Sequence, residues 1–438
     1  MLHSEMFKLK DITGEVIQQR GFLTHEPRWM RKDRELAWQK FNELEYPDWR
    51  KENLEKIDLE RQVRLVFPPG DIAPLQIGKK PPAGCAGQIV LHDGVVHRIS
   101  LKPELAYAGV IFCDMQTALL ERADLLDRFL IKSDWGVSDK LTAFHRALWE
   151  NGYFLFIPKG LKVLEPFEVQ VVQMNDRESL LHRNVIVLDE SAQASVQVSS
   201  ESSLQDSEQK PEQHSVCAVA TEVFVEKEGT FRYVSMQEWG STVYDLTYQR
   251  IYARENARVQ ALFPLLGAGA GRSVMTGVVL EKGAAIHHDG IFVAGDQKRF
   301  KIVAELEHRA EDTEGMMKYS GMLKDEASNY LDGLIRILPL CRRSLSRLEE
   351  HTLLLSPKAR CDALPALDIQ TDEVDVSHSA SVSRADEEKI FYLMSRGLSD
   401  AQARSLMVQG FFERLLEQVH DPRWADRIRQ TIQSQLAL

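Results

Sequence analysis

The sequence contains few cysteines, and they form no recognisable motif. Only five of the 438 residues are cysteine, and they are far apart, at Cys85, Cys113, Cys217, Cys341 and Cys361. No two of them make a CxxC pair, which excludes a zinc ribbon and a self-contained ferredoxin-type cluster site. An odd number of scattered cysteines is typical of a reducing compartment, so we expect a cytoplasmic protein.

Long apolar segments and dense positive charge are also missing. The N-terminus, MLHSEMFKLKD, lacks the apolar stretch of a signal peptide. No apolar run approaches the roughly 20 residues that span a bilayer. The formal net charge is −11, and the chain has no long Lys/Arg cluster. These features argue against a membrane or a nucleic acid as partner.

Signatures of common enzymes are absent as well. The sequence contains neither GxSxG nor HExxH. GAGAGR, at residues 267–272, matches no phosphate-binding motif, and we interpret it as a bend between strands. If ATP drives the work of this protein, another chain must therefore hydrolyse it. Paired acids such as Glu349 and Glu350 are common on surfaces, so we assign them no role. His287 and His288 point to opposite faces of a strand and are poor joint ligands for a metal.

The two ends of the chain have helical patterns, and the middle has the pattern of strands. Residues 1–82 are predicted to form an N-terminal helical domain and a Pro/Gly-rich linker, which starts at Pro68. LTAFHRALWENGYFLFIPKG predicts one more helix and then a strand that opens at Tyr153. In SAQASVQVSS, apolar and polar residues alternate strictly, which indicates a half-buried strand.

A short phrase recurs through the middle of the chain. It consists of a charged turn with a small residue, followed by a strand. It reads DESAQASVQV, KEGTFRYVSM, RENARVQALF, EKGAAIHHDGIF and KDEASNYLDGLIRI, and the starts at Lys227, Arg254 and Glu281 are 27 residues apart. Such a period is typical of a solenoid. We therefore predict a mainly β protein with a β-helix core over residues 83–382. A sandwich with similar turns is the alternative.

The C-terminal residues 383–438 are predicted to form a second helical domain. Asp386 is placed to cap a helix over EEKIFYLMSR, which would end at Gly397. Ser399 and Gln402 then make a capping box for the next helix. The outer face of this helical hairpin either docks a partner or packs on the end of the β-helix.

His378 is the residue that stands out just before that helix. In DVSHSASV it shares one strand face with Val376, Ala380 and Val382, so it interrupts an apolar side. A lone histidine in a strand is usually solvated or hydrogen-bonded. It is also where a desolvated imidazole ligand would lie. One imidazole does not hold iron or a cluster, so further ligands would come from elsewhere in the chain or from a second subunit.

Several long motifs resemble the SufB/SufD family of iron–sulfur cluster assembly proteins. The strongest is LPALDIQTDEVDVSHSASVSRADEEKIFYLMSRGLSDAQARSLMVQGFF, which is similar to the C-terminal signature of that family. FLFIPKGLKVLEPFEV, LLHRNVIVLDESA, SMQEWG, LEHRAEDTEGMMKYSGMLKDEA and HTLLLSPKAR follow the family order upstream. The chain length and the Trp/Arg-rich N-terminal segment are most like SufD.

The resemblance implies a fold and a role. It implies a right-handed parallel β-helix between two helical domains, in agreement with the turn period. It also implies a non-catalytic SufD-like subunit of the SufBCD scaffold, which pairs with a SufB-like paralogue. His378 would be its metal or cluster ligand at the interface. The family element that binds the SufC-like ABC ATPase matches Phe391, Tyr392, Leu393, Arg396 and Gly397.

The sequence also departs from the family pattern. Val376 occupies a position where SufD sequences often have cysteine. Cys361 lies near the region in which SufB carries its essential cysteine, and it is a second candidate metal ligand. We expect no cofactor to be held tightly by this chain alone, but iron or a nascent cluster in the complex. Two alternatives stay open: a SufB-like scaffold that holds the cluster as a homodimer, and a β-helix enzyme acting on polysaccharide.

Overall fold

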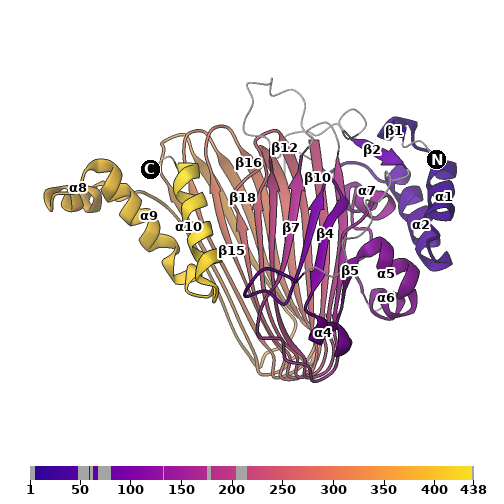
Figure 1. Ribbon diagram of the computed structural model, residues 1–438. Coiled ribbons are helices and arrows are strands. Elements are labelled where there is room, and N and C mark those ends of the chain that lie inside the picture. The colour runs from indigo at the N-terminus through magenta and orange to yellow at the C-terminus, as the bar shows by residue number, and fades with distance from the viewer. Residues whose placement is uncertain are drawn as a thin grey trace.

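Two long sheets dominate the structure, with helices at both ends of the chain (Figure 1). The computed structural model describes residues 5–47, 59, 63–67, 80–131, 133–174, 179–203 and 215–436. Residues 68–79, most of the predicted linker, lie outside the described part of the chain.

The chain alternates between the two sheets, so that one strand of each makes a coil. From the C-terminal end, one sheet contains β21 (Val374–Arg384), β19 (Ser344–Leu354), β17 (Glu314–Leu323), β15 (Ala285–Ala294), β13 (Arg258–Leu265), β11 (Thr230–Glu238), β9 (Gln193–Ser202), β7 (Phe167–Gln173), β3 (Gly87–His92) and β4 (Val95–Leu101). The other contains β20 (Arg360–Ile369), β18 (Ser328–Ile337), β16 (Arg299–His308), β14 (Ala270–Val279), β12 (Val243–Ala253), β10 (Ser215–Val225), β8 (Leu180–Leu188), β6 (Tyr153–Ile157) and β5 (Ile111–Asp114). From β6 and β7 onward, neighbouring strands in each sheet are parallel. The molecule is a parallel β-solenoid, which confirms the predicted fold class.

Alternate residues of each strand point into the space between the sheets, the lumen of the solenoid. In β9, the predicted strand residues Ala194, Val196 and Val198 are all buried there. The inward residues of successive coils form one continuous apolar core. Each coil buries its inner face only against its neighbours, because a strand pair cannot do so alone.

Left-handed turn residues explain the repeated phrase. All five predicted turns contain one, with φ of 56°, 58°, 55°, 72° and 55° at Ser191, Glu228, Asn256, Gly283 and Asp325. At the first four, the turn N–H donates to a carbonyl of the next coil, as from Ser191 to Lys227 at 2.7 Å. These hydrogen bonds offset the cost of a conformation that residues other than glycine disfavour.

The first three residues of GAGAGR, 267–269, lie in the predicted bend between β13 and β14, and its last three residues begin β14. A Cβ at Gly267 would collide with the backbone of Trp239. The next residue, Ala268, donates its N–H to the Trp239 carbonyl at 2.6 Å. The glycine therefore permits two coils to approach closely.

Most of the N-terminal helices pack on the outer face of the β20-to-β5 sheet. The helices are α1 (Gly14–Leu23), α2 (Arg28–Glu43), α4 (Pro103–Tyr107), α5 (Met115–Glu121), α6 (Ala123–Leu130) and α7 (Lys140–Leu148). Phe129 of α6 packs on Phe224 of β10, with ring centroids 5.6 Å apart. One feature differs from the prediction, because β1 (Glu5–Lys8) pairs antiparallel with β2 (Arg64–Phe67) inside a segment expected to be helical.

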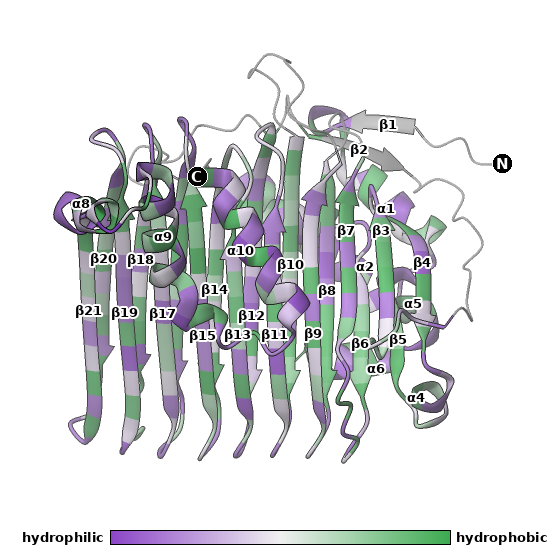
Figure 2. Cartoon of the chain, turned by 60° about the vertical axis from the view of Figure 1, so that its left-hand side comes forward, coloured by the Kyte–Doolittle hydropathy of each residue, from purple (hydrophilic) through white to green (hydrophobic). Residues whose placement is uncertain are grey.

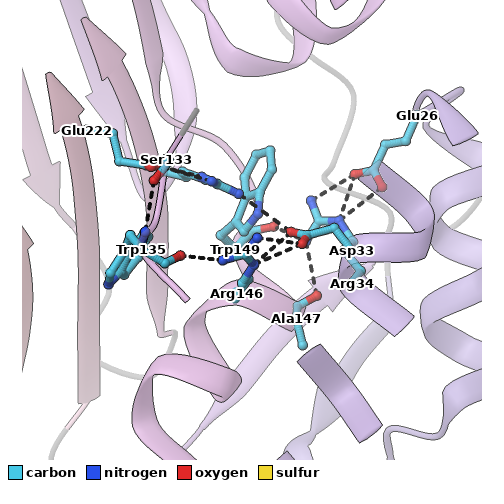
Figure 3. Close-up of polar contacts among 10 residues, drawn as sticks. Glu26, Asp33, Arg34, Ser133, Trp135, Arg146, Ala147, Trp149 and Glu222 are labelled. Atoms are coloured by element: carbon cyan, nitrogen blue, oxygen red, sulfur yellow. Dashed lines mark hydrogen bonds and ion pairs between the residues drawn. The ribbon is translucent and has the colours of Figure 1, made fainter. Parts of the chain in front are cut away.

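A buried network of charges joins these helices to the solenoid (Figure 3). Arg34 of α2 donates to Glu26 at 2.8 Å. It also donates to the carbonyls of Ala147 and Trp149 at the end of α7, at 3.0 and 2.8 Å. Burial would raise the pKa of Glu26, but the nearby arginines, above all Arg34, hold it below its ordinary value.

The C-terminal helices are α8 (Glu387–Ser395), α9 (Asp400–Leu416) and α10 (Pro422–Leu436). Phe412 of α9 and Ile428 of α10 are buried in one cluster with Ile291 and Val293, so both helices pack on the outer face of the β21-to-β4 sheet (Figure 2). α8 instead projects away from the solenoid (Figure 1). Within the described residues, every helix is too short or too polar to cross a membrane.

Candidate functional site at the open end of the solenoid

The solenoid ends abruptly at its C-terminal coil. β20 and β21 are the last strands of their sheets and lie at the same end of the molecule (Figure 2). Within the described chain, neither strand has a neighbour on its outer side. An edge strand presents unpaired N–H and C=O groups, so this end is a template for pairing with another chain.

The inner face of this last coil is also uncovered. Leu331 and Leu348, one coil earlier, point into the lumen and are 0% and 1% exposed. On the last coil, Leu367 of β20 and Val382 of β21 point the same way but are 37% and 41% exposed. The difference arises because no further coil follows. The lumen is therefore accessible from this end.

His378 lies on this open face. It pairs in register with Leu348 of β19, so its side chain belongs to the inward-facing set, as predicted from the alternation. The side chain is exposed, and Val376 beside it is half-buried. His378 makes no hydrogen bond or ion pair with any residue that the structure describes. The imidazole would lose its contact with water only if another molecule covered this face of the coil.

Cys361, the second predicted ligand, lies at the start of β20. Its sulfur is 3.3 Å from the Thr352 hydroxyl and accepts a hydrogen bond from the Asn329 amide at 3.9 Å. Burial raises the pKa of the Cys361 thiol; the hydrogen bonds oppose this shift, and the nearby acid Glu350 adds to it. The thiolate that binds metals is therefore disfavoured in the single chain.

The structure does not bring His378 and Cys361 together. Thr352, the neighbour of Cys361, aligns with Val382 of β21, whereas His378 lies four residues earlier in the strand. Among the described residues, no group of three or more His, Cys, Asp or Glu side chains is placed to hold a metal ion. A metal ion at this end would need donors from water or from another chain.

Glu350 is an unexpected member of this end. Paired acids are common on surfaces, but only Glu349 of this pair lies on the outer face of β19. Burial in β19 alternates strictly from Ser344 to Thr352, which places Glu350 on the inward face at 1% exposure. Burial, followed by the charge of Asp332, raises its pKa to about 8. The alternation in SLSRLEEHT was the signal that could have identified it.

The predicted partner-binding element forms α8 and its C-terminal end. Asp386 caps the helix through the backbone N–H groups of residues 388 and 389, and Gly397 follows with φ of 98°. Phe391 and Tyr392 are 72% and 56% exposed, while Leu393 is half-buried. The Arg396 guanidinium lies 5.1 Å from the centre of the Tyr392 ring. Two neighbouring aromatic side chains thus face solvent.

The predicted histidine pair is divided between two environments. His287 contacts Glu314 at 2.9 Å on the outer face. His288 is buried in the lumen, 3.1 Å from the Tyr319 hydroxyl. The two imidazoles therefore make separate contacts, as expected for side chains on opposite faces of a strand.

The fold and its open end define a parallel β-solenoid with helical ends and a terminal coil of two edge strands. Residues 171–411 match the family model for SUF system FeS cluster assembly, SufBD core domain. The chain therefore belongs to the SufB/SufD family of iron–sulfur cluster assembly proteins, as the resemblance of its motifs implied.

Curated relatives support this assignment over nearly the whole chain. The chain is 25% identical over 419 residues to the iron–sulfur cluster assembly protein SufB of Bacillus subtilis, which covers 92% of this chain and 89% of the relative. It is 25% identical over 425 residues to a SufBD family protein of Staphylococcus saprophyticus, with the same coverage. These matches do not separate SufB from SufD.

Proposed function

We propose that this chain is a SufD-type, non-catalytic subunit of an iron–sulfur cluster assembly scaffold. It pairs with a SufB-like paralogue through β20 and β21, and it docks a SufC-like ABC ATPase through α8. The observation that carries the proposal is the open terminal coil, on which His378 is exposed among apolar side chains. Iron and the nascent cluster are cargo of the assembled complex.

The chemistry of the terminal coil favours a SufD-type role over a SufB-like scaffold that works as a homodimer. Val376 occupies the motif position where a cysteine is usual, and the pKa of the Cys361 thiol is raised. A scaffold that holds a cluster by itself needs thiolates. Without them, this chain supplies an imidazole to a site whose sulfur ligands come from a different partner.

The exposed aromatic pair on α8 supports the ATPase-docking part of the proposal. Exposed aromatic residues with an adjacent arginine are typical of binding hot spots. Ile390 is 1% exposed and anchors α8, whereas Phe391 and Tyr392 remain 72% and 56% exposed.

The composition of the complex tests the proposal directly. The chain is co-expressed with the SufB-like and SufC-like proteins of its organism and purified on a tag that only this chain carries. We expect one complex that contains all three proteins, with its mass measured by light scattering. Recovery of a homodimer alone would support the SufB-like alternative instead.

Substitution of His378 tests the role of the imidazole. In the assembled complex, His378→Ala should abolish cluster formation, measured by absorbance after anaerobic reconstitution, and should leave the complex intact. His351→Ala is the matched control, because His351 lies on the outer face of β19 and contacts Ser381 at 2.8 Å. Equal cluster yields from the two variants would contradict the assignment of His378.

A further inference from the structure

Glu350 is buried in a way that no other acid of the described chain shares. It is 1% exposed, and neither oxygen of its carboxyl group has a hydrogen-bond partner among the described residues. By contrast, Glu26 pairs with Arg34 and Glu222 pairs with Arg183, at 2.8 Å in each case. A buried polar group without a partner is costly, so its presence requires an explanation.

The lumen is shaped to hold the Glu350 carboxyl group. A Cβ at Gly333, on the facing strand β18, would collide with Oε1 of Glu350 and lie 2.5 Å from the Leu348 side chain. The absence of that atom leaves the niche that the carboxyl group occupies. The strongest charge acting on Glu350 is that of Asp332, which is also negative. The niche therefore accommodates an acid without a compensating positive charge.

Glu350 lies one coil below the open end. It aligns with Ala380 of β21, and Leu348, two residues earlier, aligns with His378. Only the methyl group of an exposed alanine stands directly above it in the sheet. Side chains at such diagonal positions on adjacent strands are within mutual reach when they are long. A ligand that enters the lumen mouth thus meets His378 first and Glu350 next.

Other inward polar atoms of these last coils also lack partners. The Ser346 hydroxyl and the Asn329 amide oxygen have none among the described residues, and both residues are buried. These oxygens line the lumen wall on β19 and β18. The protein donors near the lumen mouth are therefore the Glu350 carboxyl group and the His378 imidazole, an oxygen and a nitrogen of the kinds that divalent transition-metal ions accept.

We propose that Glu350 is a ligand for a ferrous ion that enters the lumen through the open coil, with His378 as the second protein donor. A bound cation would displace the proton of the Glu350 carboxyl group into water and neutralise the resulting carboxylate, and water or the partner would fill the remaining coordination positions. The identity of the metal as iron rests on the proposed function. The evidence for a metal site is independent of that function and consists of the burial of Glu350 and the niche around it. Glu350 thereby becomes an internal iron ligand of the scaffold.

Metal titration of the isolated full-length chain tests this proposal. Cobalt(II) is the spectroscopic probe, followed by anaerobic ferrous ion, and Kd is measured for the unmodified chain, Glu350→Gln and Glu349→Gln. Glu349 is the matched control, because it lies on the outer face of the same strand and pairs with Lys318 at 3.3 Å. We expect Glu350→Gln to raise Kd at least about tenfold and Glu349→Gln to leave it unchanged.

Thermal melting shows whether Glu350→Gln weakens metal binding only because the variant unfolds. The glutamine side chain has the same shape as a protonated glutamate, so the melting temperature of Glu350→Gln should match or exceed that of the unmodified chain. If Glu350→Gln and the unmodified chain bind cobalt with equal affinity, the proposal is wrong. Water, and not a metal ion, would then supply the hydrogen bonds that the Glu350 carboxyl group lacks. Because no partner is present, failure of the paralogue-pairing model would not change this result.

Discussion

The two ends of the solenoid invite comparison because the same sheets finish so differently. At the N-terminal end, β4 and β5 run antiparallel to β3 and β6, and the chain returns through helices that pack on the sheet. At the C-terminal end, β20 and β21 stay parallel to their neighbours and simply stop. Inward residues stay buried at the N-terminal end, where Ile99 and Phe112 are 6% and 5% exposed, whereas Leu367 and Val382 at the C-terminal end are 37% and 41% exposed.

Buried charge shows the same contrast. Near the N-terminal end, Glu26 is enclosed together with Arg34, which completes its hydrogen bonds. Near the C-terminal end, Glu350 is enclosed with no partner in the described chain. The two buried acids thus differ in whether the fold itself supplies their hydrogen-bond partners.

The largest effect should come from breaking the closed end. Arg34→Ala leaves Glu26 buried without its main partner and removes donors from the carbonyls of Ala147 and Trp149. We expect a loss of about 3–5 kcal/mol in the free energy of unfolding, measured by urea titration. Lys40→Ala, which removes an exposed ion pair with Glu43, should leave the free energy of unfolding almost unchanged. Equal losses would show that the buried network does not hold this end.

A charge on the open end should prevent pairing without unfolding the chain. Leu367→Asp places a carboxylate on the exposed inner face of β20, where a partner would have to bury it. We expect binding to the paralogue to weaken by about 3 kcal/mol, roughly a hundredfold in Kd, measured by calorimetry. Leu364→Asp is the control, since Leu364 is 46% exposed on the opposite face of the same strand. If both variants bind alike, the inner face is not the interface.

A smaller effect is expected at the projecting helix. Phe391→Ala should weaken ATPase binding by about 2 kcal/mol, roughly thirtyfold in Kd, because it removes an exposed aromatic anchor. Tyr107→Ala is the control, because it removes an even more exposed ring, at 92%, from α4 in the N-terminal part of the chain. Its affinity for the ATPase should equal that of the unmodified chain. Comparable losses in both variants would point to a general effect of apolar surface.

Local patterns predicted much of the fold. The repeated turn sequence predicted the coils, because each turn contains a residue with a left-handed conformation at the point where the backbone changes direction. The caps at Asp386 and Ser399 predicted the starts of α8 and α9, and both side chains make the expected hydrogen bonds. Alternation alone placed His378 on the inward face, since side-chain direction in a strand has a period of two.

Features that depend on distant segments could not be predicted in the same way. The strand β1 pairs with a segment almost 60 residues away, which no local pattern indicates. The Glu26–Arg34 pair is buried only because α7 packs over it. The burial of Glu350 was not predicted, because two adjacent acids usually lie on the protein surface. In a strand, however, adjacent side chains point to opposite faces. Whether an inward residue is buried depends on the next coil, and that coil is missing above His378.

The open coil has a consequence for how this molecule behaves in time. In a stacked array, stability is nearly a sum of contacts between adjacent units, and a terminal unit has only one such contact. The last coil should therefore fray more readily than any interior coil and exchange its amide hydrogens sooner. A bound partner would supply the second contact and suppress the fraying. The entrance to the lumen would then become rigid only after assembly.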